Sequence, residues 1–441
     1  MDTFGAIQQE GEQVEGLYRP LVSHPCLSDM EGCCSKLPLL WSTVNISIWE
    51  DIGAYVYDLE SNTYAPRPDF KDVHSSATAD YFTTSALNAQ LQLSLPLTLD
   101  IVVDIGDDEQ GSLLRQALCS SMVESNRWGR LTLSWGAVRP QILSVLSELS
   151  GRLAQLQYLR LEPASPDACW PPCFAHIFAA APRLLQLDAN APRQEDFGFT
   201  LGIPAYQLTH IELHASPGAI LSLLQLHANT LIDAALVFDG SLRPSLPHLA
   251  PSVTLPYLKR LSLHGDPDCG CLVVPCLENL TLSGCIRNIS TILDRSLCAL
   301  QRLVLRHCDI EPSVLNSLLH HPSVATLLCL RIDLACCGKP VQAFITALAP
   351  PVVFTRYISF GLELSSVKHG LCEVDRKMIC DTVECSWELA KERGSPLSVL
   401  ILPNDIFSVP IQERFEQMRI DGLDINQLHN GIPVVWEGWS W

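Results

Sequence analysis

One phrase is written three times between residues 256 and 308: Leu258-Lys-Arg-Leu261-Ser-Leu263, Leu277-Glu-Asn-Leu280-Thr-Leu282 and Leu300-Gln-Arg-Leu303-Val-Leu305. Each copy has leucine at its first, fourth and sixth positions, and two copies continue to a cysteine at the ninth, Cys285 and Cys308. Apolar residues at alternating positions of such a short segment predict a strand with one buried face. A single copy cannot bury its leucines alone, so the phrase predicts a stack of copies that share one core.

Further copies of the phrase occur on both sides of this stretch, and they begin at Leu156, Leu184, Leu208, Leu231, Val324 and Leu397. From Leu156 to Val324 the starts are 19 to 28 residues apart, which matches the length of roughly 20 to 29 residues of a leucine-rich repeat. Helical spacing is found between copies, at 111–125, 141–153, 218–229, 289–297 and 311–321. The pattern predicts an α/β, leucine-rich-repeat-like solenoid: an irregular horseshoe with parallel strands on its concave face and helices on its convex face.

The periodicity divides the chain into four regions. Residues 1–36 have no sustained period and are predicted to be a disordered or loosely packed lead-in. Residues 37–110 are predicted to be a connecting or capping region with strands at 41–49 and 91–103. The repeat array is predicted to occupy 111–422, with its longest helix at 375–393, and residues 423–441 to form a C-terminal tail or cap.

Composition restricts the class of protein. The 441 residues are 47% hydrophobic and 17% charged, and the formal net charge is -19. This acidic balance argues against general binding to nucleic acid or to an anionic membrane, because both need a basic surface. The N-terminus lacks a basic start followed by an apolar run, and no apolar stretch approaches the roughly 18 residues of a membrane span. We therefore expect a cytoplasmic or nuclear protein whose 18 cysteines are reduced.

Catalytic and metal-binding motifs are not found in the sequence. It contains no Gly-x-Ser-x-Gly, no phosphate-binding loop and no His-Glu-x-x-His. The densest thiol group, Cys269, Cys271 and Cys276, lacks the paired two-residue spacing of zinc sites. These observations predict a protein without enzymatic activity, cofactor or metal.

The residues between the leucines are predicted to face the concave surface at phrase positions 3, 5 and 7. In five copies these positions hold four arginines and three histidines against two acids. The candidate partner-binding residues are the cations of this set: Arg160, His210, His214, Arg260, His264, Arg302 and Arg306.

Two interpretations of these cations remain open. In the first, the concave face binds an acidic or phosphorylated protein segment through paired hydrogen bonds from arginine, and protonated histidines strengthen binding at mildly low pH. In the second, the same residues are solvated strand positions without a role, as surface charges often are.

Several short segments resemble the F-box and leucine-rich-repeat proteins of mushroom-forming fungi. They are Leu39-Leu-Trp-Ser-Thr-Val44, Asn126-Arg-Trp-Gly-Arg-Leu131, Tyr206-Gln-Leu-Thr-His-Ile211, Leu255-Pro-Tyr-Leu-Lys-Arg-Leu261 and Arg393-Gly-Ser-Pro-Leu397. In that family an N-terminal F-box docks on the Skp adaptor of a cullin-RING ubiquitin ligase while the repeats hold a protein substrate. The resemblance implies that this chain, too, binds the adaptor through its N-terminal region and a protein substrate through its repeats.

The F-box part of the resemblance is incomplete. The opening Leu-Pro-x-Glu-(Ile/Leu) helix of the family has no counterpart in residues 1–36, and the tail of the module is represented by Leu37, Pro38, Leu40 and Trp41. Two functions therefore remain open: a substrate receptor of a ubiquitin ligase, and a repeat scaffold without a functional F-box that binds protein partners independently of ubiquitination.

Overall fold

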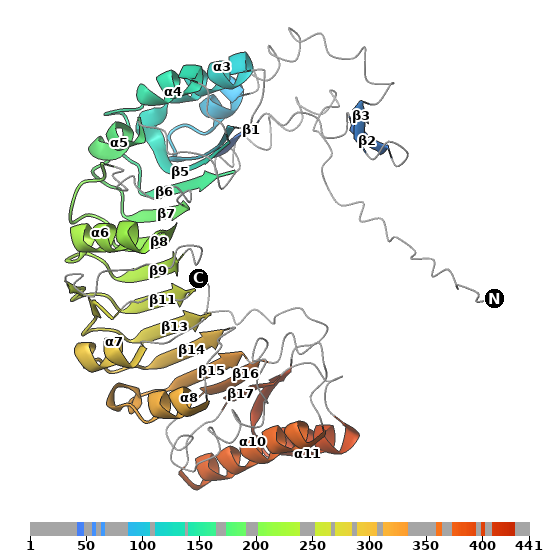
Figure 1. Cartoon of the computed structure of the whole chain (residues 1–441). Coiled ribbons are helices and arrows are strands. Elements are labelled where there is room, and N and C mark those ends of the chain that lie inside the picture. Colours follow the sequence, from blue (N-terminus) through green and yellow to red (C-terminus); the bar gives the residue numbers. More distant parts are fainter. Residues whose placement is uncertain are drawn as a thin grey trace.

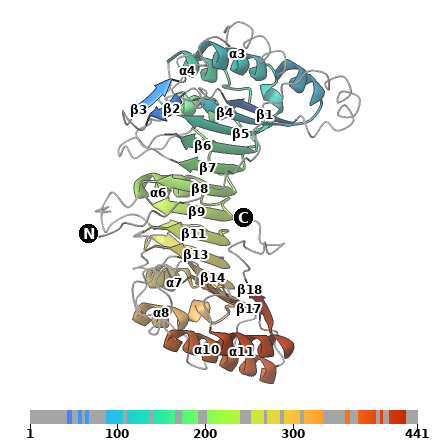
Figure 2. The ribbon, with the colours of Figure 1, turned by 90° about the vertical axis from the view of Figure 1, so that its right-hand side faces the viewer.

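The computed structural model describes residues 42–47, 55–58, 63–66, 87–105, 111–136, 140–164, 173–190, 202–238, 252–265, 270–284, 289–306, 312–333, 359–363, 373–393, 398–401 and 408–427. These residues form an α/β structure built on one sheet of 14 strands, in which the pairings between neighbours are parallel. Figure 1 shows the sheet bending into an arc, and Figure 2 shows its strands following one another along the molecule.

The order of strands in the sheet follows the order of the chain. The strands are β1 (Thr43–Ser47), β4 (Leu99–Ile105), β5 (Trp128–Trp135), β6 (Tyr158–Pro163), β7 (Gln186–Asn190), β8 (His210–Ala215), β9 (Asp233–Phe238), β11 (Arg260–His264), β13 (Asn279–Ser283), β14 (Arg302–Arg306), β15 (Cys329–Asp333), β16 (Ser359–Glu363), β17 (Ser398–Ile401) and β18 (Asp424–Gln427). Two small sheets pair β2 (Tyr55–Asp58) with β3 (Thr63–Pro66), and β10 (Val253–Thr254) with β12 (Leu272–Val273).

The helices occupy the connections between parallel strands, which need a crossover on one side of the sheet. They are α3 (Gly111–Met122), α4 (Pro140–Ser147), α5 (Phe174–Ile177), α6 (Pro217–His227), α7 (Ile289–Ser296), α8 (Pro312–Leu319), α10 (Glu373–Arg393) and α11 (Val409–Ile420). Short 3-10 turns are η4 (Ser125–Arg127), η5 (Phe178–Ala180) and η6 (Pro322–Val324). Helices α3 to α8 lie along the outer side of the arc, so the opposite, concave face of the sheet carries no helix of this set (Figure 1).

The leucines of the repeated phrase stack as the sequence predicts. Leu261, Leu280 and Leu303 are in register across β11, β13 and β14, and they are 2%, 0% and 0% exposed. Burying a leucine side chain stabilises a protein by about 2 kcal/mol. Because each copy contributes to the same column, every strand supports the burial of its neighbours.

The longest predicted helix is also present. Helix α10 contains 21 residues, and the apolar face expected for it includes Ile379, Val383 and Trp387, which are buried. It packs beside α11 at the far end of the sheet from α3 (Figure 2).

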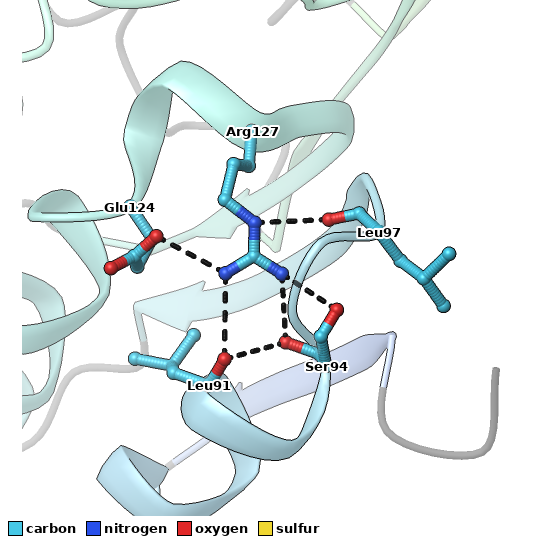
Figure 3. A network of polar contacts seen from close by, with 5 residues as sticks. All are labelled: Leu91, Ser94, Leu97, Glu124 and Arg127. Carbon is cyan, nitrogen blue, oxygen red and sulfur yellow. Dashed lines mark hydrogen bonds and ion pairs between the residues drawn. The ribbon is translucent and has the colours of Figure 1, made fainter. Parts of the chain in front are cut away.

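Arg127 ties the start of the sheet to the segment that precedes it (Figure 3). Its Nε donates to the carbonyl of Leu97 at 3.0 Å, and its Nη2 donates to the carbonyl and hydroxyl oxygens of Ser94 at 2.8 and 3.0 Å. Its Nη1 contacts the carbonyl of Leu91 at 3.4 Å and pairs with Glu124 at 3.1 Å. One guanidinium thus joins η4 to the helical turn at Leu91 and Ser94 and to the loop at Leu97. The carbonyls of Leu91 and Ser94 also accept from the Ser94 hydroxyl and from the N–H of Leu97.

The predicted strand at 91–103 is wrong in its first half. Residues 87–93 are helical, and β4 begins only at Leu99. Leu87 and Leu91 are both buried, and their separation of four residues suits one face of a helix. The leucines that alternate from Leu91 onward predict a strand, although Leu87 and Leu91 have the spacing of a helix.

Two predicted copies of the phrase are out of frame. Val324 belongs to η6, and the strand phrase that follows begins instead at Leu327, with Leu330 and Ile332 buried in β15. In β17, Val399 is in register with Phe360 of β16, and Phe360 with Leu330. The register therefore places Val399, instead of the predicted Leu400, in the row that contains the core residue Leu330.

The sheet extends past the predicted array of residues 111–422, because β1 and β4 precede it and β18 follows it. The predicted lead-in and the F-box residues Leu37, Pro38, Leu40 and Trp41 lie outside the described residues, as does most of the predicted tail. Within the described part of the chain, no helix has the length and apolar character needed to cross a bilayer.

Candidate partner-binding site on the concave face

The concave face is formed by the strand residues that alternate with the core leucines. In β4, for example, Asp100, Val102 and Asp104 are half-buried, while the residues between them are buried. Because the strands are parallel and in register, these positions align in rows across the sheet. The middle row contains Arg160, Asp188, Glu212, Ala235, Ser262, Thr281, Val304 and Arg331.

All seven predicted residues occupy strand positions of this face. His210, Arg260 and Arg302 belong to one outer row. His214, His264 and Arg306 belong to the other outer row, and Arg160 belongs to the middle row. The register does not bring them together as one set, because β6 and β14 are separated by five strands in the sheet.

Arg302, Arg306 and Arg331 form one group, which we call the arginine cluster. Arg302 and Arg306 lie on β14, and Arg331 lies on β15 beside Val304, which is midway between them. All three side chains are half-buried. Burial, together with the charges of Arg331 and Arg306, lowers the pKa of Arg302. Like charges held this close, and partly removed from water, favour an anion such as a carboxylate or phosphate beside them.

His264 borders the arginine cluster. Its Nε2 lies 3.0 Å from the hydroxyl oxygen of Ser262. Burial, and then the charge of Arg306, lower the pKa of this imidazole below its ordinary value of 6.5. Mild acidification therefore does not charge His264 readily, in contrast to the expected strengthening of binding at mildly low pH.

Arg160 and Arg260 are each bound to carboxylates of this same face. Arg160 donates from Nε to Glu162 at 2.7 Å and also lies 3.3 Å from Asp188. Arg260 pairs with Asp233 at 2.8 Å. Their charges are already matched locally, so they are weaker candidates for binding an external anion than the sequence suggests.

Glu162, Asp188 and Glu212 form a second group, which we call the carboxylate cluster. Asp188 and Glu212 are neighbours in register on β7 and β8. Burial raises the pKa of Asp188, and the charge of Glu212 raises it further, whereas Arg160 opposes the shift. The hydroxyl of Tyr158 donates to Asp188 at 3.3 Å. This part of the concave face is therefore acidic, in contrast to the positive lining predicted for the whole groove.

Further charged residues of the face lie outside the predicted set, among them Asp188, Asp233 and Arg331. Asp188 and Asp233 occupy phrase positions 5 and 3 of copies that begin at Leu184 and Leu231, so extending the same count to those copies finds them. Arg331 becomes visible only when the following copy is read from Leu327 instead of Val324.

The middle positions beside the arginine cluster are buried. Val304 is 0% exposed and Thr281 is 8% exposed, although both lie between residues that face the concave side. A partner would therefore meet the longer side chains around them. The chemistry available here is recognition of anions by guanidinium groups, with hydroxyl and amide groups of β11 and β13 beside them.

Among the residues that the structure describes, no group of His, Cys, Asp and Glu has an arrangement that could hold a metal ion. Cys276 is exposed and Cys271 is half-buried, whereas Cys269 lies outside the described residues. Comparison with models of known protein families gives no match to this sequence. A search of curated proteins likewise gives no match.

Proposed function

We propose that this chain is a leucine-rich-repeat-like solenoid without enzymatic activity that binds a protein segment on its concave face. The arginine cluster carries this proposal, because Arg302, Arg306 and Arg331 hold like charges together in a half-buried setting. Guanidinium groups recognise carboxylate and phosphate through paired, charge-assisted hydrogen bonds. An acidic or phosphorylated segment of a protein is the partner that this chemistry favours.

The shape of the sheet supports the same proposal. A curved sheet of 14 parallel strands presents rows of side chains over a long distance (Figure 1). Stacked repeats commonly use such extended concave surfaces for binding. The formal net charge of -19 makes nucleic acid and anionic membranes poor partners.

Within this proposal, the chain serves as a substrate receptor of a cullin-RING ubiquitin ligase, in the cytoplasm or nucleus, as its resemblance to F-box proteins implies. The Skp adaptor would then bind near Leu37, Pro38, Leu40 and Trp41. The alternative is a scaffold that binds partners without the ligase. Copurification of the full chain with the Skp adaptor favours the first function, and partner binding without the adaptor favours the second.

The proposal is tested by removing the arginine cluster. We expect the Arg302→Gln, Arg306→Gln, Arg331→Gln variant to lose proteins that crosslink to the wild-type chain, as identified by mass spectrometry. A matched control replaces Arg115, Arg152 and Arg419 with glutamine, because all three are exposed and lie outside the strands. The same set of proteins on a folded cluster variant would refute the proposal, and circular dichroism verifies folding.

A further inference from the structure

Exposed apolar side chains form a band where the chain enters the strands. Neighbouring strands of the sheet are parallel, so their starts lie along one rim, which we call the entry rim (Figure 2). Backbone hydrogen bonds connect this rim from strand to strand. The N–H of Ile232, for example, donates to the carbonyl of Thr209, and the N–H of Lys259 donates to that of Ile232, both at 2.9 Å. The apolar band consists of Leu185, Tyr206, Ile232, Tyr257, Leu297 and Leu328, which are 38 to 84% exposed.

The apolar band follows the repeat. One member lies shortly before each of the strands β7, β8, β9, β11, β14 and β15, and the exposed Cys276 takes this place before β13. Before β6 the described residues lack such a side chain, so the band begins at β7. At the opposite rim, where strands β7 to β15 end, the described residues include no exposed large apolar side chain. Single exposed apolar residues are normal on a protein surface, whereas a continuous row of them marks a site of interaction.

Two members of the band are held in a strained backbone conformation. Among the described residues other than glycine, only Tyr206 and Leu297 have a positive φ, at 60° and 47°. Such conformations are costly for residues with a Cβ and persist mainly at functional sites. Their N–H groups donate to the carbonyls of Leu226 and Leu293, at 3.3 and 3.0 Å. Their side chains are the most exposed of the band, at 61% and 84%, so the strained turns hold two large apolar groups in water.

The spacing of the band indicates which kind of segment would bury it. Strands β7 and β15 are six steps apart in the sheet, which corresponds to roughly 29 Å at about 4.8 Å per step. Successive turns of an α-helix are about 5.4 Å apart, so the apolar face of a helix laid along the rim keeps pace with the strands over about 19 residues. Side chains on one side of an extended segment are about 6.7 Å apart, so such a segment falls out of step within about three strands.

The charges beside the band restrict the flanks of such a helix. Arg183 and Arg295 are exposed, and each lies two residues before a member of the band. Both guanidinium groups donate to neutral oxygens, one of a glutamine side chain and one of a backbone carbonyl. The acids nearby, Glu278 and Asp294, are paired with a lysine and a histidine. Acidic residues on the flanks of a bound helix would therefore gain contacts with the two arginines.

We propose that the entry rim binds an amphipathic α-helix of a partner protein, about 19 residues long, whose apolar stripe covers the band and whose flanks carry acidic residues. Tyr206 and Tyr257 are the expected centres of binding, because tyrosine is enriched among the residues that dominate interface energies. A helix in this position uses neither the concave face nor its charges. The inference therefore goes beyond the proposed function and is tested separately from it.

Labelled peptides test the helix directly on the full chain. The helical probe has about 19 residues, with leucine at every third or fourth position, glutamates beside the leucine stripe and a chemical staple on the polar face. The scrambled probe has the same composition and staple without a stripe, and the neutral probe has glutamine in place of glutamate. Fluorescence anisotropy measures the dissociation constants. We expect the helical probe to bind about tenfold more tightly than the scrambled probe and about threefold more tightly than the neutral probe.

A variant of the band locates the probe on the entry rim. Ile232→Thr and Tyr257→Ser together should weaken binding of the helical probe about tenfold. The matched control combines Val374→Thr with Val409→Thr, because these residues are 58% and 65% exposed and lie at the starts of α10 and α11. The control variant should bind the helical probe as the wild type does. Circular dichroism verifies that both variants fold.

Equal binding of the helical and scrambled probes would overturn the inference, and so would equal binding by the band and control variants. A neutral probe that binds as tightly as the helical probe would overturn the acidic flanks. If the Arg302→Gln, Arg306→Gln, Arg331→Gln variant loses the helical probe and the band variant retains it, the probe binds the concave face. That result overturns the helix on the rim and leaves the proposed function standing. A dimer in sedimentation experiments, or binding to neutral phosphatidylcholine vesicles, that the band variant abolishes would assign the rim to a second copy or to a membrane instead.

Discussion

The two halves of the concave face have the same arrangement of strands but carry different charged side chains. From β6 to β9 the face is acidic, with Arg160 bound to Glu162 and Asp188. From β11 to β15 the strands carry Arg260, His264, Arg302, Arg306 and Arg331, and the acid Asp333 ends β15. The parallel register continues through both halves. The leucine columns thus determine where the strands lie, whereas the residues between the leucines differ from strand to strand.

The halves also differ where the chain leaves each strand. The eighth position of the phrase holds Ala215 in β8 and Phe238 in β9, and these two residues are paired in the sheet. After β11 and β13 the same position holds Gly265 and Gly284, with φ of 101° and 96°. A left-handed backbone is easily adopted by glycine and costly for other residues. The chain therefore turns out of the sheet earlier in the arginine-bearing half.

The largest expected effect comes from replacing one of these glycines. In Gly284→Ala, the new Cβ would lie 2.8 Å from the carbonyl oxygen of Gly265, in a backbone with φ of 96°. Left-handed strain and overpacking each cost roughly 1 to 3 kcal/mol, so we expect a loss of about 4 kcal/mol in the free energy of unfolding. Urea denaturation measures this loss.

The control for Gly284→Ala lies in the other half of the sheet. Ala215→Gly changes the equivalent position of β8 in the opposite sense and should cost about 1 kcal/mol through backbone entropy. Equal losses from the two substitutions would contradict the proposed difference between the halves. Hydrogen exchange should place the destabilisation by Gly284→Ala around β11 to β14.

A second difference concerns the side chain at the end of a helix that holds the neighbouring loop. In α6, Nδ1 of the buried His227 accepts from the backbone N–H groups of Gln207 and Leu208 at 3.4 and 3.3 Å. In α7, the hydroxyl of Ser296 accepts from the N–H of Val274 at 2.9 Å. The loop is thus held by a histidine, which titrates, in one half of the sheet. In the other half it is held by a serine, which does not titrate.

This difference predicts a pH dependence confined to one half. Burial lowers the pKa of His227 from 6.5 to about 4, so the unfolded chain takes up this proton first as the pH falls. The stabilisation is complete above pH 6.5 and is lost between 6.5 and about 4, by about 3 kcal/mol. Hydrogen exchange at several pH values should show α6 and its loop opening before α7 does.

The variant His227→Asn provides the control for the pH experiment. Asparagine keeps an acceptor oxygen for the loop N–H groups and does not titrate. It should lower stability at neutral pH, because a buried ring is lost, and should flatten the dependence between pH 6.5 and 4. An unchanged pH profile in this variant would assign the acid sensitivity to groups other than His227. Asp188 and Asp233 are not among these groups, because their raised pKa values make the folded state take up protons first, which stabilises it as the pH falls.

The register of the sheet could be predicted from the sequence because it depends on short, repeated spacing. Leucine at positions 1, 4 and 6 specifies which residues are buried, and Leu261, Leu280 and Leu303 align accordingly. The prediction fails where apolar residues are continuous. Near Val324 and Leu327 two frames satisfy the same spacing, and only the three-dimensional fit of η6 decides between them.

The charge separation of the candidate site could not be predicted as fully. Each copy of the phrase shows which residues face the concave side. Which of these residues form ion pairs, however, depends on which copies are neighbours and on the lengths of their side chains. Arg160 binds carboxylates of its own strand and of the adjacent one, and Arg260 binds a carboxylate of the adjacent strand. Partial burial, which shifts the pKa of Asp188 and Arg302, has no signature in a single strand.

The smallest expected effect concerns the ion pair at the boundary between the halves. Arg260 and Asp233 are 2.8 Å apart, and their side chains are 53% and 33% exposed. Burial raises the pKa of Asp233 more than Arg260 lowers it, so the pair does not fully offset the cost of its own desolvation. A double-mutant cycle with Arg260→Gln and Asp233→Asn should therefore give a coupling energy of about 0.5 kcal/mol that decreases with added salt.

A coupling energy above about 2 kcal/mol in this cycle would mean that the boundary pair holds β9 and β11 together. We expect the opposite, because Ala234 and Leu261 are in register and buried beneath it. A weak pair can be exchanged without unfolding the sheet, and the same reasoning applies to Glu212, whose side chain is exposed. Charge changes on this face should then alter which segment binds while the leucine columns keep the strands in place.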